Sequence, residues 1–199
     1  MTSEPKAGQK QDLPIKGFRD AAAFAVWLDT NQASSKGLWL KLAKRGNRTS
    51  SLTHAEALEI ALCHGWIDGQ KAPFDEGSFL QRFTPRGPRS RWSRINKEKA
   101  QALIAARRMQ PVGLAAIEAA QRDGRWDSAY ESQSRIEIPA DLACELAANP
   151  AAADFFAGLD RHNRYAILYR LGSAKKPETR LRRLRQFVEM LERKEKIHP

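Results

Sequence analysis

The chain has 199 residues, 42% of them hydrophobic, which can supply the core of one compact domain or two small ones and excludes a disordered protein. Its formal net charge of +11 favours polyanionic partners such as nucleic acid, phosphorylated ligands or anionic lipid. The polar N-terminus lacks the apolar segment of a signal peptide, and no apolar stretch reaches the length of a membrane span. The two cysteines are too few for a disulfide framework. We therefore expect a cytoplasmic protein.

Hydrophobic spacing predicts the first elements. Residues 1–16 are polar and predict a flexible tail. Asp20 can cap a helix that runs to about Gln32, because apolar residues recur every three or four positions after it. In residues 38–44 the leucines alternate, which is typical of a half-buried strand, and a turn at residues 46–51 is expected to end it.

A second helix and two more strands are predicted next. Thr53 and Glu56 form a T-x-x-E capping box, which predicts a helix start, and Gly65 predicts the end of that helix. Residues 66–71 and 78–83 are typical of short strands on either side of a turn that contains Pro, Asp and Gly. With the earlier strand they predict a small antiparallel three-stranded sheet in the N-terminal half.

The rest of the chain is predicted to be helical. A helical period begins at about Ser93 and restarts at Pro111, whereas residues 125–139 show no sustained period. The expected fold class is therefore α+β, mostly helical. We expect four divisions: a flexible tail at 1–16, an α+β domain with the small sheet and a basic loop at 17–124, a connection at 125–139, and a C-terminal helical subdomain at 140–199.

Residues 82–94, with the sequence RFTPRGPRSRWSR, are called the arginine stretch below. Pro85 and Pro88 fix φ, so the arginines are expected on an extended backbone. From Arg82 to Arg108 there are nine basic residues and one acid, a local net charge of +8. Arginine forks pair with phosphate or carboxylate oxygens, and a tryptophan can stack on a base. We predict an anion-binding site formed by Arg82, Arg86, Arg89, Arg91, Trp92 and Arg94; the alternative is a solvated, partly salt-bridged rim around a structural tryptophan.

Two further predictions concern residues outside this stretch. Asp68 would orient the arginines if the sheet brings it close to them, although an Asp-Gly turn explains it equally well. Lys175, Lys176 and Arg180 lie at the start of the last predicted helix, where backbone N–H groups and the helix dipole favour an anion. This helix can instead be amphipathic with a solvated arginine face, or lie on an anionic membrane surface.

Two other chemical interpretations are weaker. Acids, histidines and a cysteine cluster on the predicted second helix, but they lack a His-x-x-x-His pair or paired Cys-x-x-Cys motifs, so we predict no metal site. The residues concerned are His54, Glu56, Glu59, Cys63 and His64. Arg82, Pro85 and Pro88 match the Arg-x-x-Pro-x-x-Pro pattern of proline-rich ligands, but three fixed positions recur by chance.

Five short motifs resemble those of a known family. They are GLWLK at 37–41, GWIDG at 65–69, LQRFTPR at 80–86, WSRIN at 92–96 and AKKPETR at 174–180. With these motifs in order, the chain from about Asp20 to Arg193 resembles the YdeI/OmpD-associated family, described as bacteriocin-protection proteins. The resemblance implies a role in tolerance of antimicrobial peptides or envelope stress and an association with an outer-membrane porin. It implies no catalytic residues.

The sequence contains no nucleophile triad, metal-ligand cluster or complete phosphate-loop motif. We therefore expect a non-catalytic, anion-binding protein without a cofactor, whose ligand is nucleic acid or a phosphorylated molecule. Two alternatives stay open: an enzyme that acts on a small anionic substrate, and a stress-response adaptor that binds a protein partner.

Overall fold

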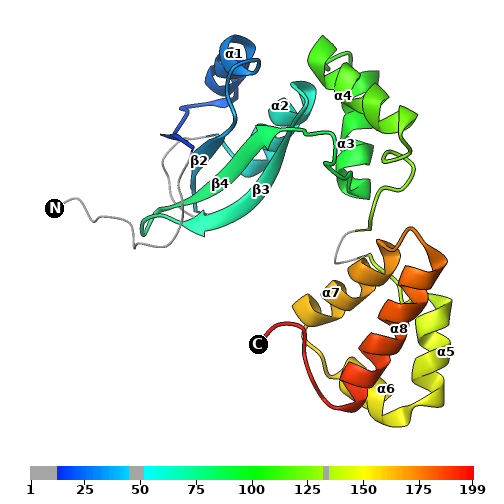
Figure 1. Cartoon of the computed structure of the whole chain (residues 1–199). Coiled ribbons are helices and arrows are strands. Elements are labelled where there is room, and N and C mark those ends of the chain that lie inside the picture. The colour runs from blue at the N-terminus through cyan, green and yellow to red at the C-terminus, as the bar shows by residue number, and fades with distance from the viewer. Residues whose placement is uncertain (1–12, 45–51, 132–134) are drawn as a thin grey trace. The chain divides into compact units, whose positions relative to one another are not determined.

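The structure is a computed structural model of the whole chain, and it describes residues 13–44, 52–131 and 135–199 (Figure 1). Most of the predicted N-terminal tail and the whole predicted turn at 46–51 lie outside these residues. The chain forms two compact units. Unit 1 comprises Met1–Arg91 and Asn96–Asp127, and unit 2 comprises Trp92–Ile95 and Ser128–Pro199.

Unit 1 contains the sheet and the first helices of the chain. Its elements in chain order are β1 (Ile15–Lys16), α1 (Ala21–Asn31), β2 (Leu38–Ala43), α2 (His54–Cys63), β3 (Trp66–Pro73), β4 (Ser78–Pro85), α3 (Arg94–Ala105) and α4 (Pro111–Arg122). The first residues of α3 are assigned to unit 2.

The strands form one sheet in the order β1-β2-β4-β3. Figure 1 labels β2, β4 and β3. β1 pairs with β2 in parallel, with Ile15 opposite Trp39, and the other pairs are antiparallel. The prediction of a mostly helical chain with a small antiparallel three-stranded sheet is therefore wrong: the described sheet is four-stranded and mixed, and roughly half of the chain is helical. β1 has only 2 residues, too few for an alternating pattern to reveal it.

The predicted starts of α1 and α2 are confirmed. Asp20 caps α1, because its side chain accepts a hydrogen bond from the Ala23 N–H at 2.8 Å. At α2 the Glu56 N–H donates to Thr53 Oγ1 at 3.3 Å and the Thr53 N–H donates to Glu56 Oε2 at 2.9 Å. The hydrogen bonds from the Thr53 hydroxyl and backbone hold the pKa of Glu56 below its ordinary value. Each cap satisfies helix N–H groups that otherwise have no partner.

β2 is buried on both of its faces. Phe24 and Leu28 of α1 are fully buried in one cluster with Leu40 of β2. Trp39 points to the other face and is buried in a second cluster with Leu80 of β4. The alternation of leucines predicted a strand that is buried on one face only. β2 is buried on both faces because Trp39, on the second face, also packs against apolar side chains.

α2 and α4 approach each other closely. The Gln110 N–H, just before α4, donates to the Cys63 carbonyl at the end of α2 at 3.1 Å. Gly113 lies in the first turn of α4, where a Cβ atom would overlap the Cys63 carbonyl and the Met109 side chain. Glycine is therefore required at this contact for steric reasons.

Unit 2 is helical and has its own core. Its helices are α5 (Ala140–Ala148), α6 (Pro150–Ala157), α7 (Arg161–Gly172) and α8 (Pro177–Glu192). Side chains of all four meet in one cluster that includes Leu142, Phe156, Ile167 and Phe187. Leu181, which shares the apolar spacing of α8, is instead 47% exposed. None of the described helices is both long and apolar enough to cross a membrane.

Candidate anion-binding surfaces

Residues 86–91, called the basic loop below, follow β4 and are closed by internal hydrogen bonds. The Gly87 N–H donates to Ser90 Oγ at 3.0 Å, and the Ser90 N–H donates to the Gly87 carbonyl at 3.0 Å. Arg86 Nη1 donates across the loop to the Arg91 carbonyl at 3.3 Å. These bonds stabilise the loop backbone in this conformation.

Arg125 supports the basic loop from outside. Its Nη1 donates to the Ser90 carbonyl at 2.8 Å, and its side chain is only 14% exposed. Asp123 orients this guanidinium by accepting from Arg125 Nε at 2.8 Å and Nη2 at 2.7 Å. Sequence reasoning missed Arg125, because its target lies 35 residues away. The only local signal is the Asp-Gly-Arg sequence, which is typical of a turn.

The arginines predicted to bind anions differ in how they are presented. Arg89 is exposed at the turn of the basic loop, and Arg82 and Arg91 are half-buried. Arg86 is half-buried, and its side chain contacts the loop backbone, which gives it a structural role in this conformation. Pro85 ends β4 and Pro88 lies in the turn, so the two prolines do not continue one extended segment.

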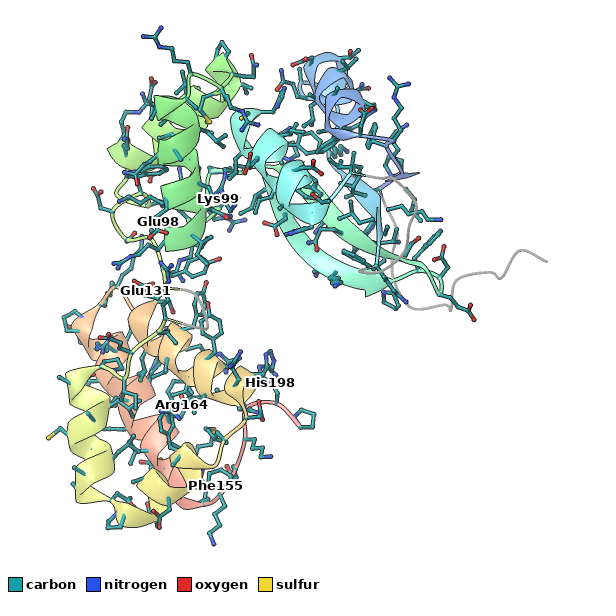
Figure 2. The ribbon with its side chains drawn as sticks, turned by 180° about the vertical axis from the view of Figure 1, so that it is seen from behind. Glu98, Lys99, Glu131, Phe155, Arg164 and His198 are labelled. Carbon is teal, nitrogen blue, oxygen red and sulfur yellow. The ribbon has the colours of Figure 1, made fainter. Side chains whose placement is uncertain are left out.

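Trp92 and Arg94 belong to unit 2, whereas the basic loop belongs to unit 1. Trp92 is 1% exposed, and its carbonyl accepts from the Tyr130 N–H at 3.0 Å. Arg94 Nη1 pairs with Glu131 Oε1 at 2.5 Å; Glu131 is labelled in Figure 2. The arginine stretch is thus divided between two units, and its tryptophan is a core residue.

Among the described residues, the ion-pair partner of Asp68 is a histidine and not an arginine. Its Oδ2 lies 3.2 Å from His54 Nε2, and both side chains are partly exposed. Asp68 is opposite Phe83 in the β3–β4 pair, so Arg82 is offset from it by one position. The structure therefore gives Asp68 the position of a carboxylate that orients His54 at the start of α2.

In the second predicted site, at the start of α8, one of the three cationic residues forms an ion pair with Asp141. Lys175 and Lys176 are exposed just before α8. Arg180 donates from Nε and Nη2 to the two carboxylate oxygens of Asp141, at 2.6 and 2.8 Å, and from Nη1 to the Leu171 carbonyl at 3.0 Å. The two lysines stay available to an anion, while Arg180 links α8 to α5 and α7.

The acids and histidines of α2 have partners of their own. Glu59 pairs with Arg108 at 3.0 Å, and His64 lies between the Ile60 carbonyl and Asp29, each at 2.8 Å. Burial raises the pKa of the Cys63 thiol. Within the described ranges, no group of three or more His, Cys, Asp or Glu side chains is placed to hold a metal ion.

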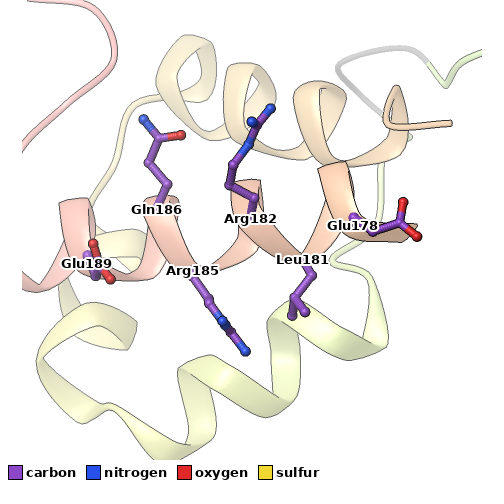
Figure 3. Close-up of a pocket in the computed structure, with 6 residues that line it drawn as sticks. All are labelled: Glu178, Leu181, Arg182, Arg185, Gln186 and Glu189. Carbon is purple, nitrogen blue, oxygen red and sulfur yellow. The ribbon is translucent and has the colours of Figure 1, made fainter. Parts of the chain in front are cut away.

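A shallow hollow of about 530 Å³ lies on α8 (Figure 3). Its lining residues are Glu178, Leu181, Arg182, Arg185, Gln186 and Glu189. All six belong to one helix, and Figure 3 shows Arg182 and Arg185 pointing to opposite sides of it. The arginines therefore do not converge on one point, and they provide exposed controls for the experiments below.

Two family models match different parts of the chain, and the division between them lies close to the boundary between unit 1 and unit 2. The chain belongs to the family described as a domain of unknown function (DUF8412), whose model matches residues 16–116, just over half of the sequence. Residues 135–194 match a second model, described as "Bacteriocin-protection, YdeI or OmpD-Associated". This match confirms the resemblance that the motifs indicated. Searches of curated proteins and of solved structures each found no significant match.

The two matches refine the extent of that resemblance. Of the five motifs, only AKKPETR lies within residues 135–194, and the other four lie within residues 16–116. The bacteriocin-protection model therefore falls in unit 2, and the unit that carries the sheet and the basic loop matches the other family.

Proposed function

We propose that this protein binds anions through the basic loop, with the phosphate groups of nucleic acid or of a phosphorylated molecule as ligands. The observation that carries the proposal is the closed conformation of the loop, in which Arg89 is exposed on a backbone fixed by Ser90 and Arg125. A preformed site loses little conformational entropy when it binds. The net charge of +11 adds a long-range attraction for polyanions.

The family match in unit 2 supports a biological setting for this activity. A domain of the bacteriocin-protection, YdeI or OmpD-associated family suggests a role in bacteriocin tolerance or stress. We infer that anion binding by unit 1 serves that role in the cytoplasm, and that no catalysis or cofactor is involved.

The test compares two variants with equal loss of charge. Arg89→Gln/Arg91→Gln changes the basic loop, and Arg182→Gln/Arg185→Gln changes exposed arginines of α8. Binding to a fluorescent single-stranded oligonucleotide is followed by anisotropy over a range of salt concentrations. Each phosphate contact that is lost should lower the slope of log K against log salt by about 0.7. We expect the loop variant to bind at least about tenfold more weakly and with a smaller slope, since each lost ionic hydrogen bond contributes roughly 1.5–3 kcal/mol.

Melting curves accompany the binding data. The α8 variant and the single variant Arg89→Gln should not change them, because exposed charges contribute little to stability. Arg91 is half-buried, so Arg89→Gln alone also shows whether a loss of binding occurs without a loss of stability. An α8 variant that loses as much affinity as the loop variant would show that only net charge matters. Unchanged affinity in the loop variant would reject the basic loop as the binding surface.

A further inference from the structure

A second pocket, of about 270 Å³, lies beside α7 in unit 2. Arg161, Arg164, Tyr165 and Leu168 repeat at spacings of three and four along α7, so they share one face of that helix. The full lining is Ile136, Leu159, Arg161, Arg164, Tyr165 and Leu168. Pockets for drug-sized ligands usually measure about 300–1,000 Å³, so this one suits a smaller molecule.

The charge of the pocket favours an anion. Two of its six lining residues are arginines, and none of the six is acidic. Two acids are adjacent in sequence to lining residues: Glu137, which is exposed, and Asp160, which caps α7. The oxygens of Asp160 accept from the Asn163 N–H at 2.9 Å and from the Asn163 side-chain amide at 2.7 Å. A recess lined by charge of one sign concentrates ions of the opposite sign.

Neighbouring aromatic rings hold two of the polar side chains in place. The Arg164 guanidinium lies 4.8 Å from the ring centroid of Phe156; Arg164 is labelled in Figure 2. The Tyr165 hydroxyl donates to the Glu131 carbonyl at 3.3 Å, and its ring lies 5.6 Å from that of Tyr169. Side chains that are already ordered lose less entropy when a ligand binds.

The remaining wall of the pocket is apolar. Leu159 and Leu168 are buried, with exposures of 8% and 3%, and Ile136 packs against the same core cluster. A ligand that is complementary to the whole pocket has an anionic group to pair with the arginines and an apolar group to contact the leucines. Two guanidinium forks match the several oxygens of a phosphate dianion better than the two oxygens of one carboxylate.

We propose that this pocket binds a small phosphate monoester that carries an aromatic or aliphatic group. Arg161 and Arg164 bind the phosphate, and Leu159, Leu168 and Ile136 contact the apolar part. This site belongs to unit 2 and does not depend on the polyanion binding proposed for the basic loop.

The experiment titrates the full chain with four probes: phenyl phosphate, inorganic phosphate, phenol and benzoate. We expect saturable calorimetric binding of phenyl phosphate, weaker binding of inorganic phosphate and benzoate, and none of phenol. Arg161→Gln and Arg164→Gln should each weaken phenyl phosphate binding by about tenfold or more, the usual effect of losing an ionic hydrogen bond. Arg182→Gln, an equal change of charge on α8, should leave it unchanged.

Each contrary result overturns the proposal. It fails if the wild-type chain does not bind phenyl phosphate, if inorganic phosphate or benzoate binds as tightly, or if Arg182→Gln weakens binding as much as Arg161→Gln. Arg161 is exposed, so its variant keeps the test valid even if loss of the Arg164 contact with Phe156 destabilises unit 2. The basic-loop variant Arg89→Gln/Arg91→Gln should bind phenyl phosphate like the wild type, which separates the two proposals.

Discussion

Arg180 binds both carboxylate oxygens of Asp141, from the first turns of α8 to the first turn of α5, across 39 residues of sequence. The two side chains are about one-third exposed, at 31% and 35%. The hydrogen bonds from Arg180 hold the pKa of Asp141 below its ordinary value, and the same contact raises the pKa of Arg180. This ion pair joins α5 to α8, two helices whose side chains also share one apolar cluster.

Asp141→Asn should remove a pH-dependent part of the stability. The folded-state pKa of Asp141 lies below the unfolded value of about 3.9, so the ion pair contributes fully above that value and is lost as the pH falls through the folded-state pKa. Chemical denaturation should show the variant less stable by about 1 kcal/mol at neutral pH, a figure limited by solvent screening. The difference from wild type should vanish in strong acid. Asp154→Asn, an exposed change in the same unit, should show no such difference.

Gly113→Ala should destabilise unit 1. The added methyl group would overlap the Cys63 carbonyl and force α2 and α4 apart, and overpacking of this kind costs about 1–3 kcal/mol. Gly172→Ala in α7 is the matched control, because no atom outside its own helix lies within 4 Å of a Cβ placed there. Alanine favours helix over glycine by up to about 1 kcal/mol, so this variant should be neutral or more stable. Equal effects of the two substitutions in urea denaturation would contradict the proposed close contact.

Trp92→Ala should lower the melting temperature. The side chain is 1% exposed, and truncation of a buried aromatic typically costs about 3–5 kcal/mol. Trp92→Phe keeps most of the apolar area and should cost less. If Trp92→Ala reduced polyanion binding while its melting curve stayed unchanged, the tryptophan would be a stacking platform and not a core residue.

Arg125→Gln should weaken polyanion binding by loosening the basic loop. Arg125 is 14% exposed and donates to the Ser90 carbonyl, so it acts as a positioning residue for Arg89. Arg122→Gln removes the same charge from an exposed site on α4 and is the control. We expect several-fold weaker oligonucleotide binding only for Arg125→Gln, together with faster amide exchange in the loop. Equal affinities would remove the support that the loop conformation gives to the proposed function.

Local signals predicted the features that depend on neighbouring residues. The caps formed by Asp20 and by Thr53 with Glu56 each involve residues three positions apart, so they could be identified from the sequence. β1 could not be found in this way, because its two residues become a strand only when β2, more than twenty positions later, pairs with them. Alternation alone also could not show that Trp39 has its own apolar partners.

The candidate surfaces were harder to predict for the same reason. A run of arginines indicates charge, but whether each guanidinium faces solvent or backbone depends on distant partners. Arg125 reaches Ser90 across 35 residues, and Arg180 reaches Asp141 across 39. The sequence therefore indicated where cations are concentrated, while their individual roles depend on tertiary contacts.

The short strand β1 also protects the sheet. The Trp39 N–H of β2 donates to the Pro14 carbonyl at 2.9 Å, so the segment before α1 occupies hydrogen-bonding groups that would otherwise form an open edge. Open strand edges recruit strands from other molecules. A chain shortened to begin after Lys16 would expose this edge, and we expect it to self-associate during purification. Affinity tags removed by a protease should therefore leave residues 13–16 in place.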